Sequence, residues 1–139
     1  MKYSYIAERK SPESLTVRLP SDLYPALRRY ASKTQECFIV ITMDGAHNVI
    51  RIKMTSLGTL NRSLVHPRDV FHAAIKDSAA CIIIAHNHPS GALSPSFEDT
   101  ELTRRLIQGG ELLGIPVLDH MIFSKEAFRS MRQESDCTF

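Results

Sequence analysis

The sequence predicts an α/β fold in which helices flank the faces of a β-sheet. Apolar runs of strand length alternate with segments whose apolar residues recur at helical spacing, in the order helix, two strands, helix, strand, helix, strand. With 139 residues, 43% hydrophobic and 23% charged, the chain has the length and composition of one globular domain. We therefore expect a single domain over residues 21–139, preceded over residues 1–20 by an N-terminal arm or short strand.

The first expected elements are a helix and a β-hairpin. Ser21 stands where an N-cap residue would, and apolar residues then recur at helical spacing to about Ser32. Residues 37–43 are apolar and β-branched, residues 49–54 alternate, and turn-forming residues separate the two runs. The alternation over residues 15–19 is typical of a short strand or an extended arm.

The middle of the chain predicts a helix, a strand and a loop. The helix begins at Pro67, because proline suits the first helical position, and ends near Asp77. Residues 80–85 form an apolar run of strand length. Residues 87–95 contain two prolines and one glycine and are therefore expected to be a loop.

The last part of the chain predicts a long helix and a strand. Helical spacing resumes at Ser96, and Gly114 has the position of a C-terminal glycine. Residues 115–123 return to a strand pattern. In the tail, apolar residues within 127–131 indicate a short helix.

Composition and charge narrow the class of protein. No apolar run approaches the roughly 20 residues of a membrane helix, and the N-terminus lacks the apolar middle of a secretory signal, so we expect a cytoplasmic protein without membrane contact. A net charge of +2, with scattered basic residues, does not indicate nucleic-acid binding. The oligomeric state is not determined by these features.

The three cysteines lack the spacing of a disulfide framework or a thiolate metal site. Two of them, Cys37 and Cys81, lie in apolar runs and are expected to be buried.

The clearest chemical pattern lies between His86 and Asp99. Side chains two apart on an extended segment point to the same side, so His86 and His88 can direct imidazole nitrogens at one zinc ion. The following loop contains proline and glycine, which allows the chain to turn back and bring Asp99 as a third ligand. These ligands would leave the fourth position of zinc open for water, as in catalytic sites.

A hydrolytic zinc site also needs a general base within hydrogen-bond reach of that water. Glu36, which leads into the apolar strand, is the carboxylate best placed for this role. Spacing alone does not select it over three other glutamates, Glu98, Glu101 and Glu111.

Each of these residues has a simpler interpretation. Two histidines at a strand end are commonly a solvated or hydrogen-bonded pair, and Glu36 alone fits an exposed charge at a strand edge. Ser96 and Asp99 have the spacing of a capping box, in which each side chain bonds the backbone N–H of the other. We expect that a carboxylate bound to a metal would not be free to close that box.

The same residues resemble a known family. A Glu before an apolar strand, then His-x-His-Pro-x-Gly, then Ser-x-x-Asp is similar to the pattern of the JAMM metalloproteases, also called MPN+ or JAB, and within them of the bacterial RadC proteins. The resemblance runs from about residue 20 onward. Its motifs are Glu36–Phe38, Gly58–Asn61, Val65–Arg68, His86–Gly91, Ser96–Asp99, Leu113–Ile115 and Leu118–His120.

The resemblance implies a cytidine-deaminase-like sandwich of helices around a mixed sheet, the JAB/MPN fold. It implies that zinc is bound by His86, His88 and Asp99, that Glu36 is the general base, and that Ser96 steadies the tetrahedral intermediate. The expected function is therefore zinc-dependent hydrolysis of a peptide or isopeptide bond in a peptide or protein substrate. The alternative is a non-catalytic, metal-stabilised binding module for a DNA-repair or mobile-element partner.

Three points limit what the resemblance carries over. The helix-hairpin-helix DNA-binding domain of full-length RadC proteins is expected to have no room in this chain, which weakens any transfer of a DNA-repair role. Asp69 stands where RadC sequences usually have Glu, away from the metal pattern. Asp119 and His120 form a further RadC-like pair without a metal role in the JAMM pattern, and His120 is interpreted as a hydrogen-bonded sheet residue, with a role beside a metal ligand as the alternative.

Overall fold

The computed structural model describes residues 9–10, 15–58 and 65–139. Its helices are α1 (Pro20–Arg28), α2 (Pro67–Lys76) and α3 (Phe97–Leu113). Its strands are β1 (Arg9–Lys10), β2 (Glu36–Met43), β3 (Val49–Gly58), β4 (Cys81–Asn87), β5 (Val117–Phe123) and β6 (Phe128–Ser130).

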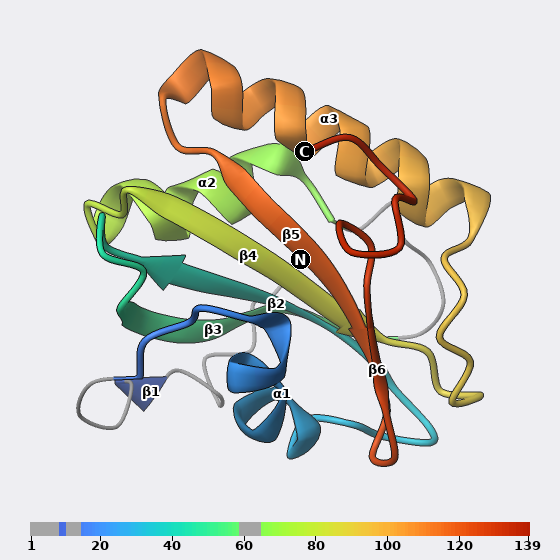
Figure 1. Cartoon of the computed structure of the whole chain (residues 1–139). Helices are drawn as coiled ribbons and strands as arrows, with labels where there is room; N and C mark the ends of the chain where they lie inside the picture. Colours follow the sequence, from blue (N-terminus) through green and yellow to red (C-terminus); the bar gives the residue numbers. More distant parts are fainter. Residues whose placement is uncertain (1–8, 11–14, 59–64) are drawn as a thin grey trace.

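The strands form one six-stranded sheet in the order β1-β3-β2-β4-β5-β6. β2 pairs antiparallel with β3 and with β4, whereas β4 pairs parallel with β5. The sheet is therefore mixed. Figure 1 shows α2 and α3 on one face of the sheet and α1 on the other, so the predicted α/β sandwich is confirmed.

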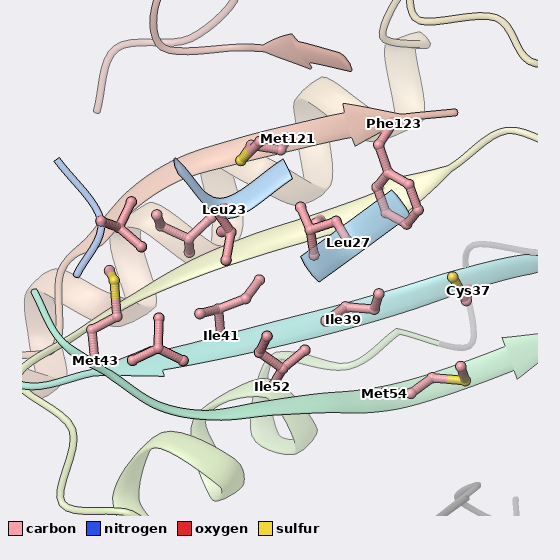
Figure 2. Packing of buried hydrophobic residues seen from close by; sticks show 14 of the residues in the cluster. Leu23, Leu27, Cys37, Ile39, Ile41, Met43, Ile52, Met54, Met121 and Phe123 are labelled. Atoms are coloured by element: carbon pink, nitrogen blue, oxygen red, sulfur yellow. The ribbon is translucent and has the colours of Figure 1, made fainter. Parts of the chain in front are cut away.

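The central strands are apolar on both sides because helices cover both faces of the sheet. Along β2, alternate residues enter two different cores. The core under α1 contains Leu23, Leu27, the odd-numbered residues of β2, and Cys81, Ile83 and Ala85 of β4. Figure 2 shows Leu23 and Leu27 of α1 above the β2 side chains Ile39 and Ile41. The core under α2 and α3 contains Phe38, Val40, Val70, Phe71, Ile82, Ile84, Leu102 and Leu106, all less than 9% exposed.

The predicted cap of the first helix is wrong. The N-cap is Leu19, not Ser21, and Pro20 is the first helical residue. The Asp22 carboxylate accepts hydrogen bonds of 2.9 Å from the backbone N–H groups of Leu19 and Arg18. An acidic residue in the first turn thus replaces the expected serine as the partner of the unpaired N–H groups.

The predicted helix in the tail is also wrong. Phe128–Ser130 is strand β6, which pairs antiparallel with β5, and Met131 donates a backbone hydrogen bond of 2.9 Å to the His120 carbonyl. An unpaired edge of β5 therefore outweighed the weak helical spacing of this segment.

The N-terminal arm contributes little to the sheet. Residues 15–19 are not a continuous strand, because only Thr16 bridges to Asn48, and β1 pairs with residues 51–52 of β3. The remaining residues of the predicted arm, 1–8 and 11–14, lie outside the described part. The division into an arm and one domain from residue 21 stays a prediction.

The other elements follow the sequence pattern closely. α2 begins at Pro67 as predicted, and α3 ends at Gly114, whose φ of 69° is the left-handed conformation that glycine adopts most easily. β4 extends one residue beyond the predicted end at His86, so Asn87 belongs to the strand and not to the predicted loop.

The buried cysteines are confirmed as core residues. Burial raises the pKa of the Cys37 thiol to about 12, so this side chain is unreactive in the folded protein. Cys81 is buried as well, and Cys137 is partly buried. No helix among the described residues has the length and apolar character needed to cross a membrane.

Candidate metal centre

His86 is the last residue of β4 that faces α2 and α3, and it is 1% exposed. It lies between the neighbouring strands β2 and β5, opposite Phe38 and Ile122. The Phe38 ring stacks nearly parallel to the imidazole at a centroid distance of 6.4 Å. The sheet therefore fixes the position of the ring, which points toward α3 because even-numbered β4 residues face that side.

His88 is positioned by the tight turn that follows β4. Gly91 donates a 2.8 Å backbone hydrogen bond to the His88 carbonyl and has a φ of 82°, which other residues rarely adopt. The turn brings the Ala92 carbonyl to 2.9 Å from Nδ1 of His88. Because a carbonyl only accepts, Nδ1 carries the hydrogen, and the lone pair of the neutral ring lies on Nε2.

Asp99 lies in the first turn of α3 and is 1% exposed. Its Oδ2 accepts a 2.8 Å hydrogen bond from Ser96 N, and its own N–H donates at 3.0 Å to Ser96 Oγ, so the capping box is formed. The same carboxylate also faces both histidines. The expectation that a metal-bound carboxylate would not be free to close this box stays a prediction. A carboxylate has two oxygens with about four acceptor sites, so the number of acceptor sites allows both roles.

The three predicted ligands converge on one point. Nε2 of His86 lies 3.0 Å from Nε2 of His88 and 3.3 Å from Oδ1 of Asp99, and Nε2 of His88 lies 3.0 Å from Oδ2 of Asp99. In a tetrahedral zinc site with bonds of about 2.0–2.1 Å, neighbouring ligand atoms lie about 3.3 Å apart. The spacing of these donors therefore fits a single small cation.

The electrostatics of the cluster also require positive charge. Burial opposes ionisation of Asp99, but its contacts with His86 and His88 outweigh this and hold the pKa of the carboxyl below its ordinary value. A metal ion held by these three residues would balance the charge of the buried carboxylate.

Glu36 lies beside the three proposed ligands. One carboxylate oxygen of Glu36 and one donor atom from each ligand lie within 4.8 Å of one another. Glu36 begins β2 on the side of the sheet that faces α3, and it is less buried than the ligands. Among the described residues, no other glutamate belongs to this cluster, so the fold separates Glu36 from the three glutamates of α3.

Ser96 lies at the margin of the cluster rather than within it. It is the N-cap of α3 and is partly buried, and its Oγ accepts from the Asp99 N–H. A hydroxyl that accepts one hydrogen bond can still donate another. A donor role toward a reacting oxygen is therefore compatible with the capping role.

Asn87 is a site residue that the sequence reasoning missed. It lies between the two histidines and points to the opposite face of the sheet, as the period of two in a strand requires. Its Oδ1 accepts at 2.8 Å from Cys37 N, and its Nδ2 donates at 3.0 Å to the carbonyls of Ser32 and Gln35. These bonds hold the segment after α1, which ends at Arg28 rather than near Ser32, and thereby place Glu36.

We expect Asn87→Leu to destabilise the protein by at least about 2 kcal/mol, because the buried Cys37 N–H loses its acceptor. Urea unfolding measures this change. The matched control is Ser90→Ala in the adjacent exposed turn, where we expect less than about 0.5 kcal/mol. Equal stability of the two variants would show that Asn87 does not hold the segment before β2.

A cavity opens beside the cluster. It has a volume of about 340 Å³ and is lined by Asn87, His88 and the turn that follows, together with Lys33 and Lys125. The side chain of His88 is 10% exposed, compared with 2% for His86 and Asp99. Of the cluster, only His88 lines this cavity, and its side chain is more exposed than those of His86 and Asp99.

Comparison with known proteins identifies the family of this chain. The family model described as RadC-like JAB domain matches residues 17–136. The chain belongs to the RadC family. The candidate metal cluster lies on the motifs of this family, and among the motif residues only 59–61 fall outside the part of the chain that the structure describes.

Several curated relatives of this RadC-like chain are named only "UPF0758 protein", which states no activity. One from Alkaliphilus metalliredigens is 44% identical over 91% of this chain and 51% of its own length. One from Methanospirillum hungatei is 51% identical over 73% of this chain and 45% of its own length. One from Microcystis aeruginosa is 40% identical over 93% of this chain and 54% of its own length. The chain thus spans about half the length of these relatives.

Proposed function

We propose that this RadC-like domain is a zinc-dependent hydrolase of a peptide or isopeptide bond. The observation that supports it is the division of roles within one cluster. The Nε2 atoms of His86 and His88 lie 3.0 Å apart and each lies 3.0–3.3 Å from one oxygen of Asp99, whereas Glu36 stands beside these three residues and is less buried. A purely structural zinc site has four protein ligands, no open coordination position and no need for an additional base.

Zinc is the metal that this set of donors favours. Two imidazole nitrogens and one carboxylate oxygen are the ligands of several catalytic zinc sites, whereas magnesium and calcium prefer oxygen ligands alone. Bound zinc would supply a Lewis acid and an activated water for attack on a carbonyl. His86, His88 and Asp99 would hold it.

The remaining polar residues have complementary roles in this proposal. The Glu36 carboxylate accepts a proton from the attacking water and returns it to the leaving amine. The Ser96 hydroxyl donates a hydrogen bond to the oxygen that becomes negative during the reaction. The substrate approaches on the side of His88, whose side chain is 10% exposed compared with 2% for His86 and Asp99.

The test is hydrolysis of peptide and isopeptide libraries by the purified, zinc-loaded chain, with products identified by mass spectrometry. We expect cleavage that a zinc chelator abolishes and that added zinc restores. No cleavage despite one zinc per chain would contradict the proposal and favour the alternative, a metal-stabilised binding module for a DNA-repair or mobile-element partner.

Labelled DNA belongs in the same experiment as a second substrate. The net charge of +2 does not favour a polyanion, so we expect no chelator-sensitive cleavage of DNA. We propose a cytoplasmic setting, since the described cysteines are unpaired and a reducing compartment suits them.

A further inference from the structure

A buried chain of polar side chains lies behind the candidate metal ligands. Nδ1 of His86 is 2.6 Å from Nε2 of His120, and Nδ1 of His120 is 2.6 Å from Oγ1 of Thr103. Thr103 Oγ1 in turn donates at 2.6 Å to the carbonyl of Asp99. His120 and Thr103 are both 0% exposed.

The direction of each hydrogen bond follows from its chemistry. The Asp99 carbonyl can only accept, so the hydrogen of the Thr103 hydroxyl is committed to it; the sulfur of Met131, at 3.9 Å, is a far weaker acceptor. Thr103 Oγ1 must then accept from Nδ1–H of His120. In a neutral His120 ring, Nε2 is therefore the acceptor, and Nδ1 of His86 carries the hydrogen.

We propose that His120 and Thr103 are positioning residues for the metal centre. They hold His86 in the tautomer whose Nε2 lone pair faces the cluster, and they link His86 to the helix turn that carries Asp99. This inference rests on the proposed metal site. It adds to that site one residue of β5, His120, and one residue of α3, Thr103, which lie outside the ligand motif.

The surroundings of His120 favour this role over simple core packing. The Phe38 and His120 rings meet edge-on at a centroid distance of 5.9 Å, and Thr103 of α3 bonds the His120 ring. An apolar side chain would fill this space without the expense of burying polar groups. Instead the position holds an imidazole with both nitrogens bonded, and one bond goes directly to a ligand ring.

Loss of the Thr103 hydroxyl should change the tautomer of the His86 imidazole. In Thr103→Val, Nδ1 of His120 loses its acceptor, so the other tautomer of His120, with hydrogen on Nε2, becomes favourable. That hydrogen would point at Nδ1 of His86 and move the His86 hydrogen to Nε2, the atom needed by the metal. Thr103→Ser keeps the hydroxyl and should keep the original arrangement.

The first experiment measures the zinc Kd of each variant by competition with a chromophoric chelator. We expect Thr103→Val to bind zinc 10- to 100-fold more weakly and Thr103→Ser to stay within about threefold of the original chain. Thr42→Val is the matched control, because Thr42 is also 0% exposed and its hydroxyl donates at 2.8 Å to Asp77, away from the cluster. Equal zinc affinity of Thr103→Val and Thr42→Val, with both folded, would overturn the proposal.

A second experiment needs no variant. Nitrogen-15 NMR of the zinc-loaded chain reports which nitrogen of each histidine carries hydrogen. We expect hydrogen on Nδ1 of His120 and on Nδ1 of His86, whereas hydrogen on Nε2 of His120 would overturn the proposal. The measurement remains decisive if Thr103→Val fails to fold.

These measurements separate the inference from the hydrolase proposal. Weak zinc binding by Thr103→Val supports the positioning role even if the chain cleaves no peptide, since neither readout requires turnover. An original chain that binds no zinc at all would overturn both.

Discussion

Replacing Asp99 with alanine is expected to weaken zinc binding at least about 1,000-fold, so that the purified variant carries far less than one zinc per chain. The substitution removes the only charged ligand of the proposed three, and the buried nitrogens of His86 and His88 then face each other at 3.0 Å without a carboxylate. Metal analysis after dialysis against a buffered zinc concentration measures the loss. We expect the same result for His86→Ala.

The control for Asp99→Ala is Glu98→Ala, the neighbouring exposed acid in the first turn of α3. It removes a similar charge near the helix N-terminus but no group of the cluster, and it should keep one zinc per chain. The Asp99 variant also loses a capping interaction of about 1 kcal/mol, so both chains are compared by urea unfolding without metal. Full zinc occupancy in folded Asp99→Ala would exclude the proposed ligand set.

Replacing Glu36 with glutamine is expected to separate metal binding from turnover. The amide has nearly the size of the carboxylate but cannot accept the proton of the attacking water, so we expect kcat to fall about 100- to 10,000-fold. Zinc content should stay at one per chain, because the three proposed ligands, His86, His88 and Asp99, are unchanged in this variant. Metal analysis and turnover of any substrate found in the library assay test the two parts.

The matched control is Glu101→Gln, since Glu101 lies on α3 in an exposed ion pair with Arg104. It should keep both zinc and turnover. Retained turnover in Glu36→Gln would remove Glu36 from the mechanism, and loss of zinc in that variant would instead indicate that Glu36 is a fourth ligand.

Much of the fold could be predicted because local patterns agree with tertiary contacts. The apolar runs of β2 and β4 remain strands because helices cover both faces of the sheet. Pro67 begins α2 and Gly114 caps the end of α3. Both depend on the backbone conformation that proline or glycine prefers, so neither requires a contact with another part of the chain. The tail at Phe128–Ser130 differs, because an edge of β5 was there to pair with it, and no local pattern reveals an unpaired edge.

For the site, the residue pattern was enough to predict the donor types and the shared side of His86 and His88, because a strand alternates with a period of two. Spacing along the chain did not select Glu36 among the glutamates, although the family resemblance named it. The tertiary structure brings it to the cluster, since β2 and α3 meet there while the other candidates remain on α3. It also brought His120 behind His86, through parallel pairing of β4 with β5. Distances between groups far apart in the chain depend on how strands pair and helices pack, and spacing along the sequence does not contain them.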